Sequence, residues 1–184
     1  MDIGAAAYRR FLEGDDKGIE ELIAEYKDSL MLYLAGFSGD LTTAEELMED
    51  VFVKLVVDKP AYRGKSSFKT WLFAIAGNVA RDYLRKKKRR KTEAFDDLAH
   101  LPADEEDLLK EHFQSEDKLA VRRCMEKLSP EYKQVLYLTF FEGFSNSEAA
   151  RIMKKTTRQV ENLLYRAKQS LGTELRKEGF EYEK

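Results

Sequence analysis

The chain has 184 residues, of which 43% are hydrophobic and 36% are charged. At roughly 100–200 residues per domain, this length allows one domain or two small ones. Ten glycines and three prolines are too few for a turn-rich β protein, and helix formers dominate, so we predict an all-α fold. A single cysteine, Cys124, excludes an internal disulfide and fits a reducing compartment. No apolar run is long enough for a signal peptide or a membrane span, so we expect a cytoplasmic protein.

The net charge of −2 hides two adjacent blocks of opposite sign. Residues 81–91 read RDYLRKKKRRK, with eight basic residues and one acidic residue, whereas residues 92–117 hold ten acidic residues and one lysine. Eight cations exceed what capping a helix end requires, so we interpret the basic run as binding nucleic acid. The acidic block contains Pro102 and scattered apolar residues, which predict a flexible linker. We therefore expect an N-terminal helical domain at 1–91, an acidic linker at 92–117 and a C-terminal helix-turn-helix domain at 118–184.

Apolar residues at steps of three and four predict three helices in the N-terminal domain. Thr42 or Thr43, with a glutamate three residues later, has the capping-box pattern of a helix start. Ser66 or Ser67 is expected to cap the next helix. Trp71 lies on the apolar stripe of that helix, so we interpret it as core rather than as a stacking surface. The expected elements are a helix over Ile19–Leu34, a turn at Gly36–Asp40, a helix at Thr42–Val57, a loop at Asp58–Ser67 and a helix from Phe68 to about Arg89.

The C-terminal domain has the pattern of a helix-turn-helix. Its first clear helix starts at Ser129-Pro130, with serine as N-cap and proline at the first helical position, and its core face is expected to include Phe141. Ser145 with Glu148 and then Thr156 with Gln159 form two successive capping boxes. They predict a short helix, a turn of about three residues and a longer helix.

The longer helix leaves a polar face pointing outward. Side chains at such positions reach base edges when a helix of this kind lies in the major groove, and arginine and asparagine can each make two hydrogen bonds to one base. Basic residues one turn later suit backbone phosphates. The alternative is a plain helical hairpin whose outer face is only solvated. The candidate base-reading residues are Thr157, Arg158, Glu161, Asn162 and Tyr165, and the candidate phosphate contacts are Arg166 and Lys168.

These residues resemble a known family. Leu128-Ser129-Pro130, Phe141-Glu142-Gly143-Phe144-Ser145, Glu148-Ala149-Ala150 and Leu164-Tyr165-Arg166-Ala167-Lys168 are similar to the C-terminal domain of extracytoplasmic-function (ECF) sigma factors, a subfamily of the sigma-70 family. That domain reads the −35 promoter element in the family. The stretch Tyr62–Arg85 is similar to the family's promoter-melting and −10-reading segment, and Ala44–Phe52 to the helix that docks on the clamp helices of the polymerase β′ subunit. Lys154-Lys155-Thr156 departs from the family's usual Gly-Ile/Val-Ser turn.

The resemblance implies sites in the N-terminal domain. The loop would hold a flipped −10 base through Tyr62, Arg63, Lys65 and Ser66, although Tyr62 is equally well read as packing under the loop. Asn78 would bond a base edge, and basic residues would hold phosphates, namely Arg81, Arg85, Lys86, Lys88 and Arg89. Polymerase would bind through Glu45, Glu46, Leu47, Met48, Glu49 and Phe52.

The resemblance also implies partners: core RNA polymerase, promoter DNA and an anti-sigma factor. One alternative is a stand-alone helix-turn-helix regulator, but no heptad seam for a dimer is visible, so we expect a monomer. Another is a metal-dependent nuclease using the acids around Glu49. No histidine joins those acids, and no nucleophile–base pair, phosphate-binding loop or zinc spacing is present, so we expect no enzyme, no metal and no cofactor.

Overall fold

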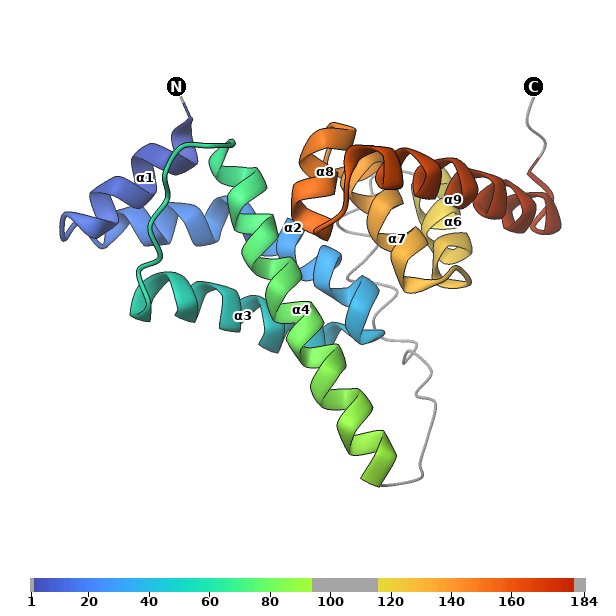
Figure 1. The fold of residues 1–184 in the computed structure, drawn as a ribbon, viewed down its shortest axis with the longest axis horizontal. Helices are drawn as coiled ribbons and strands as arrows, with labels where there is room; N and C mark the ends of the chain where they lie inside the picture. The colour runs from blue at the N-terminus through green and yellow to red at the C-terminus, as the bar shows by residue number, and fades with distance from the viewer. Residues whose placement is uncertain (1, 94–115, 181–184) are drawn as a thin grey trace. The chain divides into compact units, whose positions relative to one another are not determined.

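The computed structural model describes residues 2–93 and 116–180 (Figure 1). Every regular element in these two ranges is helical, which confirms the all-α prediction. The elements are α1 (Ile3–Leu12), α2 (Lys17–Ser38), α3 (Leu41–Val57), α4 (Phe68–Glu93), α6 (Glu116–Glu126), α7 (Pro130–Leu136), the π-helix η1 (Tyr137–Phe141), α8 (Asn146–Met153) and α9 (Thr157–Lys177).

The helices group into two compact units, as expected. The N-terminal unit contains α1 to α4, and the C-terminal unit contains α6 to α9, except that residues 151–154 group with the first. Most of the expected linker at 92–117 lies outside the described residues, and the exact domain boundaries remain a prediction.

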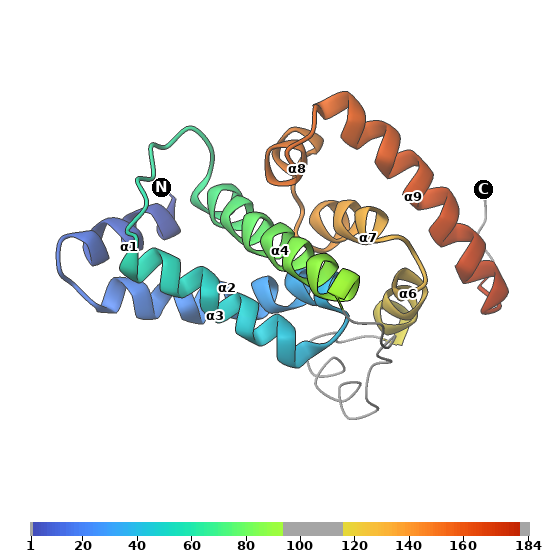
Figure 2. The ribbon, with the colours of Figure 1, turned by 60° about the horizontal axis from the view of Figure 1, so that its bottom comes forward.

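In the N-terminal unit, α2 packs against α1, α3 and α4. The helix α3 runs alongside α2 in both views (Figure 2). Burying one leucine or phenylalanine side chain contributes about 1.5–3 kcal/mol, so the apolar stripes hold this unit together. Fully buried side chains include Leu22, Leu30 and Leu34 of α2, Leu55 of α3, and Phe68, Leu72 and Phe73 of α4.

Two expected boundaries in this unit are wrong. The helix α2 continues to Ser38 and ends at Gly39, whose φ of 86° is left-handed, so the turn is shorter than Gly36–Asp40. The N-cap of α3 is Asp40, whose Oδ1 accepts a hydrogen bond of 2.7 Å from the backbone N–H of Thr43. Aspartate caps as well as threonine does, and Asp40 already has extended backbone. The helix α1 was not predicted from the sequence.

The C-terminal unit is built on α9, which packs against α7 and α6. Ser129 stands at the N-cap of α7 and Pro130 at its start, as predicted. The helix then widens into the π-turn Tyr137–Phe141, which was not predicted. The extra residue per turn rotates the following side chains, so Phe141 is only half-buried and Phe140 is 57% exposed. The core side chains here include Cys124, Val135, Leu136, Leu138, Val160 and Ala167.

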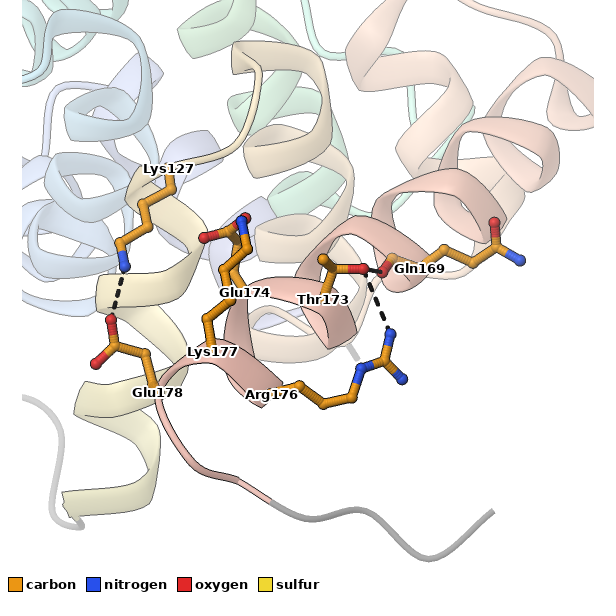
Figure 3. Close-up of polar contacts among 7 residues, drawn as sticks. All are labelled: Lys127, Gln169, Thr173, Glu174, Arg176, Lys177 and Glu178. Atoms are coloured by element: carbon orange, nitrogen blue, oxygen red, sulfur yellow. Dashed lines mark hydrogen bonds and ion pairs between the residues drawn. The ribbon is translucent and has the colours of Figure 1, made fainter.

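The C-terminal end of α9 is tied to the end of α6 (Figure 3). The ammonium of Lys127 pairs with the carboxylate of Glu178 at 2.6 Å, and this pair lowers the pKa of the Glu178 carboxyl from its ordinary value. Within α9, Thr173 donates to the carbonyl of Gln169 and accepts from Arg176. Because these groups are exposed, solvent and salt screen them, and the buried stripe rather than the ion pair fixes α9.

Within residues 2–93 and 116–180, the helices are all too short or too polar to cross a membrane.

Candidate nucleic-acid interface

Both capping boxes of the helix-turn-helix form as predicted. Ser145 and Glu148 exchange hydrogen bonds of 2.9 and 3.3 Å between side chain and backbone. Thr156 and Gln159 do the same at 2.8 and 3.2 Å at the start of α9. Lys154, in the turn between the two helices, has a φ of 55°, a left-handed conformation that glycine adopts more readily. The turn therefore has the shape expected of the motif, with some local strain at a lysine.

The outer face of α9 is exposed along its whole length. Val160 and Ala167 are fully buried on the inner side, and every candidate residue from Thr157 to Lys168 is exposed on the other side. Tyr165 is 65% exposed, and its hydroxyl accepts a 2.8 Å hydrogen bond from Gln169. Gln169 was missed by the sequence analysis, although its spacing four residues after Tyr165 places it on the same face.

Lys168 lies on one flank of this face. Its ammonium is 5.2 Å from the ring centroid of Phe140, and both residues line an apolar groove of about 400 Å³ with Met125 and Leu171. Arg166 is two residues away and therefore lies on the opposite flank of the helix. The two cations border the base-reading face from either side. Phosphate contacts through them remain a prediction.

The candidate residues of α4 fall on two different faces. Asn78, Arg81, Arg85 and Lys88 recur at steps of three, four and three, so they share one face, with Arg89 beside Lys88. We call these five residues the α4 stripe. Lys86 instead lines a groove of about 850 Å³ between α3 and α4, as do Lys87 and Arg90. The sequence grouped Lys86 with the stripe because it could not separate the two faces of a helix end that is basic all round.

Asn78 has a fixed orientation on this face. Its Oδ1 accepts a 2.9 Å hydrogen bond from the guanidinium of Arg81. Since an arginine side chain has only donors, the amide oxygen of Asn78 must face Arg81, and its NH₂ group is directed elsewhere. Asn78 is exposed and so can donate to another molecule.

The inner side of the loop at Asp58–Ser67 packs against α4, and the tip of the loop is exposed. The hydroxyl of Tyr62 donates to the carbonyl of Ser66 at 2.6 Å, and its ring lies 5.5 and 5.3 Å from the rings of Phe68 and Trp71. Burial and the nearby Asp2 carboxylate raise the pKa of Tyr62. Tyr62 thus packs under the loop, as one of the two readings had it, and Trp71 packs in the same cluster as expected. The exposed residues of the tip are Arg63, Gly64 and Lys65, and Ser66 is half-buried.

The candidate polymerase-binding residues of α3 divide by burial. Glu45, Glu46 and Glu49 are exposed and Met48 is half-buried. Leu47 and Phe52 are each only 6% exposed, so the expectation that they lie on a docking surface does not match their place in the core. The exposed apolar residues of α3 are Val53, Val56 and Val57 near its C-terminus, with Val57 71% exposed. The sequence signal for these residues is the run VFVKLVV at positions 51–57, which places apolar side chains on all sides of the helix and so leaves some of them exposed.

The part of the chain that the structure describes holds no group of three or more acidic, histidine or cysteine side chains arranged for a metal ion.

Comparison with known proteins matches both units. The family model for Sigma-70 region 2 matches residues 22–90, and that for Sigma-70 region 4 matches residues 118–171. RNA polymerase sigma factor YlaC of Bacillus subtilis is 31% identical over 157 residues, which are 83% of this chain and 89% of YlaC. ECF RNA polymerase sigma factor SigM of the same organism is 28% identical over 160 residues, 83% of this chain and 92% of SigM. The fold is similar to the sigma factor RpoE of Bartonella quintana, solved with the anti-sigma factor NepR, with a TM-score of 0.70, 22% identity, and coverage of 87% of this chain and 98% of that chain.

The chain therefore belongs to the sigma-70 family of RNA polymerase sigma factors. Within that family it is a member of the extracytoplasmic-function subfamily. This membership favours the sigma-factor reading over the stand-alone helix-turn-helix regulator.

Proposed function

We propose that this sigma factor directs core RNA polymerase to promoters by reading two elements with its two units. The C-terminal unit reads the −35 element in duplex DNA, and the N-terminal unit captures the −10 element as it melts. The observation that carries the proposal is the pair of exposed polar faces, one on α9 and one on α4, each on a separately packed unit.

In the C-terminal unit, α9 enters the major groove with Arg158 and Asn162 facing base edges. Both side chains are exposed, and both types can hold one base with two hydrogen bonds. Thr157, Glu161 and Tyr165 lie beside them on the same face, while Arg166 and Lys168 reach phosphates on either flank. The base contacts supply specificity, and the phosphate contacts supply affinity that falls with salt.

In the N-terminal unit, the exposed loop tip and the α4 stripe form the −10 site. Opening a duplex costs a few kcal/mol for each flipped base, and binding of the separated strand offsets that cost without hydrolysis by this chain. The loop residues Arg63, Lys65 and Ser66 border the base, and Tyr62 supports them from beneath. Asn78 offers its NH₂ group, which favours a base acceptor at that position, because Arg81 occupies its amide oxygen. Arg85, Lys88 and Arg89 hold phosphates.

Core polymerase docks on α3. The exposed carboxylates Glu45, Glu46 and Glu49 and the half-buried Met48 contact the β′ clamp helices, while Leu47 and Phe52 act from the core by holding α3 in place. An anti-sigma factor is a further partner, since the similar RpoE is solved with one. The protein acts in the cytoplasm as a monomer until it joins polymerase, and it performs no catalysis of its own.

Reconstitution tests this function. The purified chain, core polymerase, or both are incubated with sheared genomic DNA of the host, and the 5′ ends of the transcripts are sequenced. The proposal expects a discrete set of start sites that requires both components and whose upstream DNA shares two separated motifs. Transcripts that are identical with and without the chain, or start sites that share only one motif, would contradict it.

A further inference from the structure

The N-terminal segment Asp2–Leu12 contacts both ends of the loop that the proposed function assigns to the −10 base. This segment lies outside the region that matches the family model, which begins at residue 22. It was also not anticipated from the sequence.

One carboxylate caps two helices. Oδ1 of Asp2 accepts a 3.1 Å hydrogen bond from the backbone N–H of Ala5 in the first turn of α1. Oδ2 of the same side chain accepts a 2.6 Å hydrogen bond from the backbone N–H of Phe68, the first residue of α4. A negative charge at a helix N-terminus is favoured by the helix dipole, and here one charge serves two. Asp2 thereby fixes the point at which the loop ends and α4 begins.

A second residue of the segment holds the beginning of the loop. The hydroxyl of Tyr8 donates a 2.9 Å hydrogen bond to the carbonyl of Pro60, and Tyr8 is 1% exposed. Its ring lies 5.5 Å from Phe68 and 5.4 Å from Trp71. The ammonium of Lys59, just before Pro60, lies 5.3 Å from the ring centroid of Phe11. The segments on both sides of the loop tip, Lys59-Pro60 before it and Phe68 after it, are thus held by the N-terminal segment Asp2–Leu12.

The close approach of α1 to α4 and α2 depends on Gly4. A Cβ on Gly4 would lie 2.5 Å from Cδ1 of Phe68 and 2.9 Å from the hydroxyl of Tyr26, so only glycine lets α1 come this near. Ala7, Tyr8 and Phe11 bury the same side of α1. The loop tip between the two held ends stays exposed.

From this arrangement we infer that Asp2 and Tyr8 are positioning residues for the −10 site, which rests on the proposed function of the loop. They order the loop before DNA arrives, so binding of the flipped base does not have to pay the entropy of ordering it. Neither residue contacts DNA. The variants Asp2→Asn and Tyr8→Phe keep the size of each side chain and remove the charge or the hydroxyl.

The test uses holoenzyme, core polymerase plus the full chain, and a promoter recovered in the reconstitution above. Affinity is measured for two DNA probes, a fork with the −10 element already single-stranded and a duplex that carries only the −35 element. Each variant is expected to weaken binding to the fork by about 2–10-fold, the loss that one hydrogen bond explains, and to leave binding to the −35 duplex unchanged. Backbone amides of residues 61–66 should also exchange with solvent faster in both variants.

Asp15→Asn is the matched control. Asp15 pairs with the guanidinium of Arg10 in α1 at 3.5 Å and accepts from the backbone N–H of Lys17 at the start of α2 at 3.2 Å, so this change disturbs the packing of α1 on α2 without touching the loop. It should leave binding to both probes unchanged. Equal loss on both probes, or a loss with Asp15→Asn as large as with Tyr8→Phe, would reduce α1 to a general stabiliser and overturn the inference. Wild-type holoenzyme that fails to bind the fork would instead refute the proposed function.

Discussion

Replacing both Lys88 and Arg89 by alanine is expected to flatten the salt dependence of promoter binding, whereas replacing Lys86 and Lys87 is not. The two double variants remove the same charge from adjacent positions of α4. Lys88 and Arg89 belong to the α4 stripe with Asn78, while Lys86 and Lys87 line the groove toward α3, and the ammonium of Lys87 lies 5.5 Å from the ring centroid of Tyr83.

The expected size follows from counterion release. Each phosphate contact contributes about 0.9 to the slope of log affinity against log salt on duplex DNA and about 0.7 on a single strand. Two lost contacts therefore lower the slope by roughly 1.4–1.8. Between about 50 and 200 mM salt, the variant should lose roughly tenfold less affinity than the wild type does. The groove variant should keep the wild-type slope.

Fluorescence anisotropy of holoenzyme with a labelled forked promoter, at four or more salt concentrations, gives both slopes. Equal flattening by the two double variants would mean that the basic end of α4 acts as a diffuse charge rather than through one face. No flattening by the Lys88/Arg89 variant would mean that the stripe does not touch phosphates, and the placement of the −10 strand along α4 would be wrong.

Arg158→Ala should cost roughly 1–3 kcal/mol of discrimination at one −35 base, measured on a set of singly substituted duplexes, whereas Arg176→Ala at the far end of α9 should leave every preference intact; equal losses would deny α9 its reading role. Lys154→Gly should raise the free energy of unfolding of the C-terminal unit by roughly 0.5–1 kcal/mol, because the left-handed φ of 55° strains a lysine, and a lower melting temperature would contradict this. Burial raises the pKa of Tyr8 and Tyr26 to about 12, so the folded N-terminal unit favours their neutral forms. The stability that they contribute is complete below pH 10, the ordinary pKa of tyrosine, and is lost as the pH rises toward about 12. The tyrosinate absorbance that a Tyr8→Phe/Tyr26→Phe double variant lacks should then appear together with the loss of helical circular dichroism, and its appearance near pH 10 in an intact helical protein would refute the assignment.

Sequence patterns predicted the elements that depend on local chemistry. The capping box of α9 forms because Thr156 and Gln159 satisfy each other's backbone within one turn, and no distant residue is needed. The N-cap of α3 was harder, since Asp40 and Thr42 are both good caps and the choice depends on where α2 ends. The π-turn at Tyr137–Phe141 depends on tertiary packing, which periodicity cannot show.

The candidate site residues also separate into those predictable from local pattern and those that depend on tertiary packing. Exposure of Arg158 and Asn162 follows from the apolar stripe on the other side of α9, so it could be read from the sequence. The burial of Leu47 and Phe52 depends on what covers α3, and the contact of Asp2 with Phe68 joins residues 66 positions apart. Spacing already placed Leu47 on one stripe with Val51 and Leu55, and the resemblance to the family is what assigned it to a docking surface. The contact between Asp2 and Phe68 could not be found without the fold, because no short-range pattern joins the two residues.

The central claim is that two separately packed units grip different stretches of one promoter, and site-specific crosslinking tests it most directly. A photoreactive amino acid at position 158 or at position 63 is carried into holoenzyme, and the crosslinked nucleotides are mapped on an open promoter complex. The account predicts that position 158 marks upstream duplex DNA and position 63 marks a melted downstream base. Crosslinks from both positions to the same stretch, or from position 63 to duplex DNA alone, would contradict it.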